Sequence, residues 1–283
     1  NGKKWVLENI PYYARWYRLQ LFWGFCDGIH ESLCKDPDWH FPERSINHTN
    51  ERFRINMIKH IESLIGEDKE LLDKVIPDYP PYGKRMLMDN NWFKMLKKEN
   101  VNLITDKINY INQNSITTIN KSYNIDAIVA ATGFNAGKMI WPIKVIGKKG
   151  INLNDYWEND NPRAHIGITV PNFPNFFMMY GPNTNLAHGG SIVFQGECQI
   201  RYILGCISLL LEKNYNNMDC KIESYIKYNT KLDEQHGKMV WTHNKVDSWY
   251  RNKSGRVTTN SPWRLVDYWN FTKEPKETDY IFN

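Results

Sequence analysis

The sequence predicts an α/β fold, and three patterns support this prediction. Residues Asp126 to Phe134 (DAIVAATGF) contain a nearly unbroken apolar run that ends in a Thr-Gly turn, which is typical of a strand covered on both faces. Upstream, a short helix pattern at Trp92–Lys98 precedes a strand pattern at Val101–Thr105, as in the return half of an α/β unit. Downstream, the segment Gly181–Ser191 leads into a long helix pattern.

The N-terminal quarter of the chain predicts helices. Apolar side chains recur at three- and four-residue spacing over 16–26 and 51–64, and Gly66 provides a stop signal. The run Asp78 to Gly83, which contains two prolines, predicts a linker after which the hydrophobic period changes. No Met precedes Met57, so we expect either processing or a longer parent protein.

Further elements are expected along the rest of the chain. Ile116–Ile119 predicts a hairpin strand, and the aromatic run Asn175–Tyr180 predicts a central strand. Ser191 is a credible N-cap for a helix that runs to about Lys213. A second helix is expected over Lys221–His236.

Two turns are candidate ligand sites. In open α/β sheets ligands bind beyond the carboxyl ends of strands, which points to the Thr-Gly turn at Thr132-Gly133. The helix start near Ser191 would present free N–H groups and partial positive charge to an anion. Both features are also compatible with ordinary strand–turn–helix connections that bind nothing.

The adjacent cations Lys84 and Arg85 follow the linker. A pair of charges in this position is usually a solvated surface turn. The alternative is that the arginine projects into a cleft and stabilises an anion there. His188, beside two glycines, is open to the same two interpretations, as a loop residue or as a ligand contact.

Composition and motifs exclude several classes. The net charge of +5 is mild and the lysines are dispersed, which argues against nucleic-acid binding. The five Cys form no CxxC pattern, so neither a zinc site nor a disulfide framework is expected, and reduced thiols in a cytoplasmic protein are predicted. No apolar stretch is long enough to span a membrane. The chain contains no Gly-x-Gly, and hence no dinucleotide fingerprint.

Five stretches in order nevertheless resemble the C-terminal half of a flavin-dependent monooxygenase of the Baeyer–Villiger type, and within it the 4-hydroxyacetophenone monooxygenase-like branch. They span almost the whole chain. The stretches are Trp5–Trp23, Pro80–Ile104, DAIVAATGF, Pro171–Ser191 and Ser254–Trp269.

This resemblance implies an incomplete flavoprotein with two Rossmann-like dinucleotide-binding domains and a helical insertion. Residues 1–78 would be the insertion of the NADP domain, 79–125 the return through that domain, and 126–283 the C-terminal part of the FAD domain. Both Gly-rich fingerprints would lie upstream, which agrees with their absence from this sequence.

The resemblance also implies an activity and site residues. In the family, NADPH reduces FAD, the reduced flavin reacts with O2, and one oxygen atom enters a ketone to give an ester or lactone. The anion that attacks the ketone needs a fixed cation, a role that the resemblance gives to Arg85 with Lys84 beside it. Cofactor contacts are expected at Thr132, Gly133, Asn183, Thr184, Gly190 and Ser191.

Two alternatives remain at this point. The parent enzyme could oxygenate nitrogen or sulfur instead of a ketone, although an arginine beside the anion favours the ketone reaction. The chain by itself could instead be a catalytically inert truncated product. The resemblance allows a homodimer and names neither the substrate nor the individual roles of His188, Asn183 and Thr184.

Overall fold

The computed structural model describes residues 2–187 and 189–283. They form two compact units, each built from separate stretches of the chain. Unit 1 contains the residues up to Phe53, Tyr79–Met86 and Ala136–Asn283, and unit 2 contains Arg54–Asp78 and Leu87–Asn135. Among the described residues, no helix is both long enough and apolar enough to cross a membrane.

Unit 1 begins with a succession of short helical segments, as the apolar spacing of this region predicts. The α-helices there are α1 (Gly2–Asn9), α2 (Tyr13–Phe22) and α3 (Gly28–His30). A π-helical turn, Trp23–Asp27, joins α2 to α3, and a 3-10 turn, Glu31–Leu33, follows α3.

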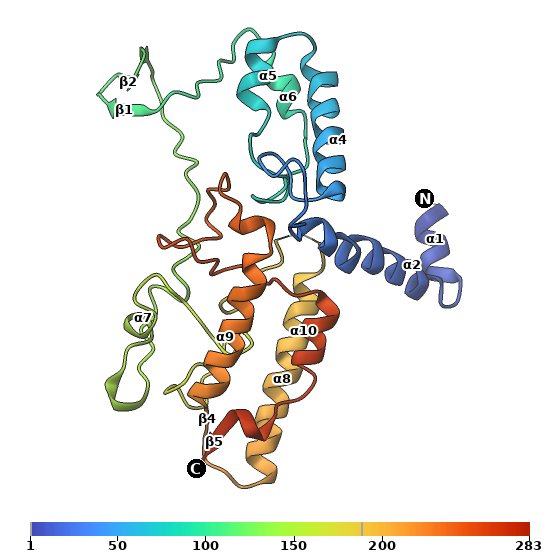
Figure 1. The fold of residues 1–283 in the computed structure, drawn as a ribbon, viewed down its shortest axis with the longest axis vertical. Helices are drawn as coiled ribbons and strands as arrows, with labels where there is room; N and C mark the ends of the chain where they lie inside the picture. Colours follow the sequence, from blue (N-terminus) through green and yellow to red (C-terminus); the bar gives the residue numbers. More distant parts are fainter. Residues whose placement is uncertain (1, 188) are drawn as a thin grey trace. The chain divides into compact units, whose positions relative to one another are not determined.

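Three helices surround the main core of unit 1. They are α8 (Ile192–Glu212), α9 (Ile222–Gly237) and α10 (Leu265–Phe271), which lie side by side in Figure 1. Buried side chains from all three meet in one apolar cluster, including Tyr202 of α8 and Leu232 of α9. Both predicted long helices are confirmed. Each is stabilised by packing its apolar face against the other helices.

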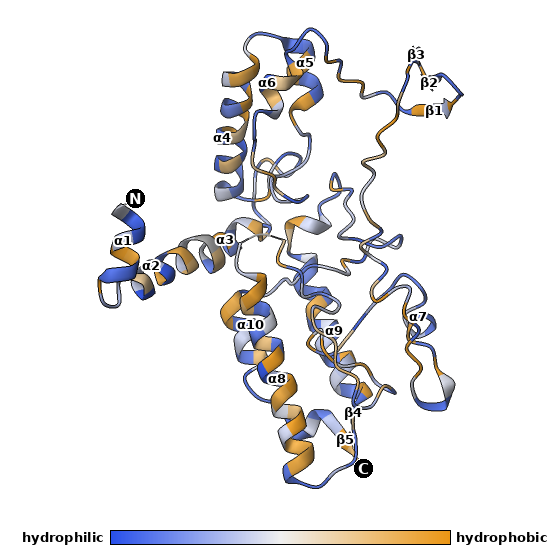
Figure 2. Ribbon diagram, turned by 180° about the vertical axis from the view of Figure 1, so that it is seen from behind, coloured by the Kyte–Doolittle hydropathy of each residue, from blue (hydrophilic) through white to orange (hydrophobic). Residues whose placement is uncertain are grey.

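The start of α8 agrees with the prediction from Ser191. Its backbone is extended, and its Oγ accepts a hydrogen bond from Phe194 N at 3.4 Å, so it caps the helix. The face of α8 that contains Cys198 and Cys206 is buried, whereas Leu204 and Leu211 are exposed. Figure 2 shows the helix hydrophobic along most of its length.

Small elements complete unit 1. The strand β4 (Met218–Cys220), which precedes α9, pairs antiparallel with β5 (Tyr280–Phe282) at the C-terminal end of the chain. The others are the helix α7 (Leu153–Tyr156) and the 3-10 turns Lys148–Gly150, Val240–Thr242 and Glu277–Asp279.

Unit 2 combines short helices with a small sheet. It takes most of α4 (His48–Ile65), which also reaches unit 1, and the helices α5 (Lys69–Val75) and α6 (Trp92–Leu96). Its antiparallel sheet has the order β1 (Ile108–Ile111), β2 (Ser115–Thr118) and β3 (Ser122–Asn124). The hairpin strand predicted at 116–119 is thus confirmed, and so is the stop of α4 before Gly66, which has φ +81°.

The buried strand predicted over Asp126–Phe134 is wrong for this structure. The segment is irregular, and the side chains of Val129 and Phe134 are 90% and 98% exposed. A strand forms only where neighbours take up its backbone N–H and C=O groups. Among the described residues, no strand pairs with this segment.

Two other predicted strands are also wrong. Residues 101–105 and 175–180 adopt irregular backbone, although both follow strand-like patterns. In the second segment the backbone bonds are isolated rather than laddered. Asn175 N donates to Met218 O at 3.0 Å, and Met178 N donates to Ile168 O at 2.9 Å. Apolar residues of this segment therefore pack on the core without forming a sheet.

Candidate functional site

Arg85 lies in unit 1 and contacts a loop distant in sequence. Its Nη1 donates a hydrogen bond to the carbonyl oxygen of Leu186 at 3.1 Å, while the residue as a whole stays exposed. A guanidinium has five N–H donors, so this contact fixes the group and leaves it able to bind an anion. Lys84 is oriented differently, with its Nζ 4.7 Å from the centre of the Tyr79 ring.

Leu186 is fixed by apolar packing. It is buried with Cys26 of the π-helical turn and Leu265 of α10. The start of α10 is held by Asp27, whose carboxylate accepts hydrogen bonds from Leu265 N at 2.7 Å and Val266 N at 3.3 Å. The carbonyl that receives Arg85 therefore belongs to an anchored residue rather than to a free loop.

The predicted residues Asn183 and Thr184 lie in the same loop, and both are buried. Asn183 has φ +59°, and its Nδ2 donates to Val257 O at 2.8 Å. Thr184 Oγ1 donates to Gly181 O at 2.7 Å. Both side chains therefore hold the loop through hydrogen bonds to backbone carbonyls of the protein itself.

The segment 257–261 runs beside this loop and was not singled out residue by residue from the sequence. Asn185 N donates to Thr259 O at 2.9 Å, and Asn185 Nδ2 donates to Asn260 Oδ1 at 2.8 Å. Tyr180 OH donates to Asn185 Oδ1 at 2.5 Å. The sequence signal for this segment was the family resemblance of the stretch SGRVTTNSPW, which contains no local motif.

Arg85 makes the local electrostatics favourable to negative charge. Burial raises the pKa of Tyr180, and Arg85 opposes that rise. Burial likewise raises the pKa of Tyr250 to about 12, again against the influence of Arg85. The guanidinium thus stabilises the anionic form of two phenols on this side of unit 1, as it would stabilise an anionic ligand.

Gly190 and Ser191 lie where the loop enters α8. Gly190 has φ +113°, and a Cβ there would lie 3.0 Å from Leu265 Cδ1, so a side chain would be strained. Ile192 and Val193 in the first turn are exposed, which leaves this helix start accessible. His188 lies outside the described residues.

Thr132 and Gly133 belong to unit 2. Both are exposed, and Gly133 has φ +79° with open space where a Cβ would lie. The structure thus brings together Arg85, Asn183, Thr184, Gly190 and Ser191 within unit 1, with Lys84 in the same segment as Arg85.

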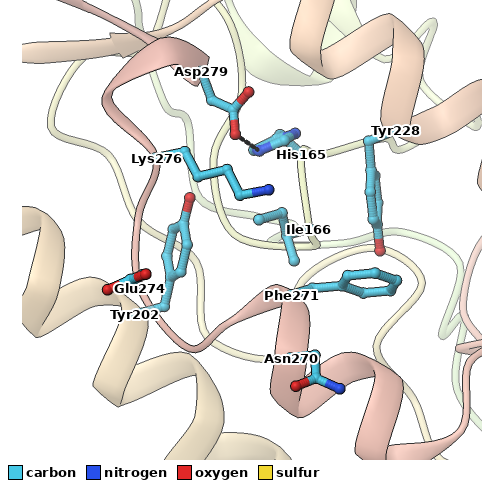
Figure 3. Close-up of a pocket in the computed structure, with 9 residues that line it drawn as sticks. All are labelled: His165, Ile166, Tyr202, Tyr228, Asn270, Phe271, Glu274, Lys276 and Asp279. Carbon is cyan, nitrogen blue, oxygen red and sulfur yellow. Dashed lines mark ion pairs between the residues drawn. The ribbon is translucent and has the colours of Figure 1, made fainter.

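A separate cavity of about 350 Å³ also lies in unit 1. Figure 3 shows an ion pair on its wall, in which His165 Nε2 lies 3.7 Å from Asp279 Oδ2. The nearby imidazole of His165 lowers the pKa of the Asp279 carboxyl. None of the residues predicted from the sequence lines this cavity, whose lining is His165, Ile166, Tyr202, Tyr228, Asn270, Phe271, Glu274, Lys276 and Asp279.

Comparison with known proteins identifies relatives of the chain, although no protein-family profile matches it. An uncharacterized monooxygenase of Sinorhizobium fredii is 41% identical over 98% of this chain and 42% of its own length. A Baeyer–Villiger monooxygenase of Pseudomonas aeruginosa is 36% identical over 74% of this chain and 40% of its own length. Relatives of the chain are thus monooxygenases, and Baeyer–Villiger monooxygenases are among them.

Solved structures show the same fold relationship. An oxidized steroid monooxygenase bound to NADP superimposes with a TM-score of 0.73 at 20% identity, over 88% of this chain and 46% of that protein. The chain therefore shares the fold of part of that monooxygenase. It spans less than half the length of the curated relatives that it matches.

Proposed function

We propose that this chain forms the C-terminal part of an FAD- and NADPH-dependent monooxygenase that inserts one oxygen atom from O2 into a ketone, giving an ester or lactone. The contact between Arg85 and Leu186 carries this proposal. It joins two stretches that the family resemblance assigns to one site, although 101 positions separate them. The fold would be an incomplete pair of dinucleotide-binding domains with a helical insertion.

The residues present fit part of a flavin site. The exposed start of α8 offers a helix N-terminus suited to an electron-rich ring carbonyl or a phosphate. Thr132 and Gly133, which are exposed in unit 2, stay proposed cofactor contacts from the resemblance alone. The chain has no Gly-x-Gly turn to hold a pyrophosphate, so the remainder of the parent protein would supply it.

Each residue has a distinct part in the proposed reaction. Bound FAD, once reduced by NADPH, would supply the oxygen-activating chemistry. Arg85 would hold positive charge beside the anion that attacks the ketone, and the loop carbonyl of Leu186 would fix its direction. Asn183 and Thr184 would keep that loop rigid, while Lys84, stacked on Tyr79, would support the position of Arg85.

The alternatives differ in what the cation does. Oxygenation of nitrogen or sulfur uses a protonated oxidant and needs no anion-stabilising arginine, so the position of Arg85 favours the ketone reaction. The chain by itself would bind FAD poorly because the phosphate contacts are missing, and activity is proposed for the parent protein. A cytoplasmic location and a homodimer remain predictions from the sequence.

The test is to express the complete coding sequence that contains this chain. The purified protein should be yellow, oxidise NADPH and convert an aryl ketone to an ester. Retention of flavin with sulfide oxidation but no ester would favour the second chemistry. A full-length protein without bound flavin would overturn both versions of the monooxygenase proposal.

A further inference from the structure

Arg256 is a largely buried cation close to the candidate site, and the sequence patterns give it no individual role. Its side chain is 11% exposed, and its Nε donates to both carboxylate oxygens of Asp233 at 2.9 and 3.1 Å. Burial lowers the pKa of Arg256, and Asp233 opposes this effect. The carboxylate therefore holds the guanidinium in its charged form and in one orientation.

One of the remaining donors of Arg256 reaches the loop of the candidate site. Nη2 donates to Asn183 Oδ1 at 3.4 Å, and Nη1 donates to Pro162 O at 3.0 Å. With Oδ1 accepting from a cation, the amide of Asn183 must direct Nδ2 the other way, toward Val257 O and His236 Nε2.

The state of His236 agrees with this orientation. Burial, reinforced by the charge of Arg256, lowers the pKa of His236 to about 3. The imidazole is therefore neutral near pH 7, so Nε2 can accept the bond from Asn183 Nδ2 at 3.2 Å. Arg256 thus binds Asn183 directly. By helping to keep His236 neutral, it also leaves the Nε2 of His236 able to accept a hydrogen bond from Asn183.

The backbone carries this constraint to Arg85. Asn183 N donates to Thr258 O at 3.1 Å, and Ser261 N donates to Asn185 O at 2.9 Å. The next residue, Leu186, provides the carbonyl that receives Arg85. Only three positions separate the amide that Arg256 holds from the acceptor of the proposed site cation.

We infer that Arg256, anchored by Asp233, is a positioning residue that sets the loop 183–186 and thereby the direction of the Arg85 guanidinium. Its consequence for the reaction rests on the proposed function. Its effect on the loop is a property of this chain and can be measured without any cofactor.

The first experiment measures amide hydrogen exchange of 183–187 in this chain. Arg256→Met should speed exchange in the loop by about tenfold, because the buried carboxamide loses its partner. Arg163→Met is the matched control: Arg163 Nη2 lies 3.2 Å from the same Asp233 but makes no contact with Asn183 that the structure displays. It should change loop exchange by less than about twofold.

The second experiment measures ester formed per NADPH oxidised in the full-length enzyme. Arg256→Met should lower this ratio by about tenfold while flavin reduction by NADPH stays within about twofold of wild type. Arg256→Lys, which retains the charge, should recover part of the ratio. Arg163→Met should retain the wild-type value.

Two outcomes would overturn the inference. One is unchanged loop exchange in Arg256→Met, and the other is equal acceleration in Arg256→Met and Arg163→Met, which would indicate general loosening. If the wild-type enzyme forms no ester, the proposed function fails, whereas the exchange comparison still decides whether Arg256 holds the loop.

Discussion

The guanidinium of Arg85 donates a hydrogen bond to the carbonyl oxygen of Leu186 across 101 positions of sequence. Leu186 is itself packed between Cys26 and Leu265. A cation is thereby fixed at the loop that enters α8 while it remains exposed to a ligand. This relationship makes the candidate site testable through its individual residues.

Lys84 and Arg85 should differ in their effects, although both were predicted as catalytic. The Nζ of Lys84 lies over the Tyr79 ring, so Lys84→Met should change ester formation by less than about fivefold. Steady-state kinetics of the full-length enzyme with an aryl ketone would check this. A loss of about a hundredfold would give Lys84 a direct part in the chemistry.

Gly167, which packs against Thr184 of the loop 183–186, should tolerate no side chain. This residue has φ +74°, and a Cβ there would lie 2.1 Å from Thr184 Cγ2. Gly167→Ala should lower the free energy of unfolding by about 2–4 kcal/mol, from backbone strain and overpacking together.

Gly255→Ala separates these two causes, since Gly255 has φ +86° with no atom within 4 Å of the position that a Cβ would take. It should cost only about 1 kcal/mol. Urea unfolding of both variants measures the difference. Equal losses would show that Thr184 does not constrain the loop.

Acid should destabilise the chain through His236. Burial lowers its folded pKa to about 3, whereas the unfolded value is about 6.5. Between these values the unfolded chain binds a proton that the folded chain does not. Stability is therefore fully present above about pH 6.5 and falls as the pH decreases, by at most about 1.4 kcal/mol per pH unit.

His236→Gln is the variant for this test, because it retains an acceptor for Asn183 Nδ2. Its free energy of unfolding should decrease less than that of wild type between about pH 7 and about pH 5. Urea titrations at the two pH values give the comparison. Identical decreases in the two proteins would contradict a neutral, buried imidazole.

The buried thiols should be unreactive in the folded chain. Burial raises the pKa of Cys206 and of Cys220 to about 12, so little thiolate exists at pH 8. Alkylation followed by mass spectrometry should label partly buried Cys34 first and these two only after unfolding. Rapid native labelling of Cys206 would place α8 outside the core.

Local signals predicted some features and failed on others for a physical reason. The cap at Ser191 and the stop at Gly66 depend on neighbouring residues, so the sequence was sufficient for both. The strand pattern over Asp126–Phe134 needs pairing partners that the described residues do not provide.

The candidate site divides in the same way. The resemblance pointed to Arg85, Asn183 and Thr184, and the structure places them around one loop. The resemblance gave no individual role to Arg256, because the pairing of Arg256 with Asp233 and Asn183 is set by tertiary packing rather than by a local motif.

The most direct measurement compares ester formation by wild type and Arg85→Ala in the full-length enzyme, with flavin reduction by NADPH recorded in the same preparations. Exposed Arg52 of α4 provides the control, Arg52→Ala. We predict that Arg85→Ala loses ester formation by about 10²–10³-fold while flavin reduction and the control remain near wild type. Equal ester yield from Arg85→Ala would contradict the account.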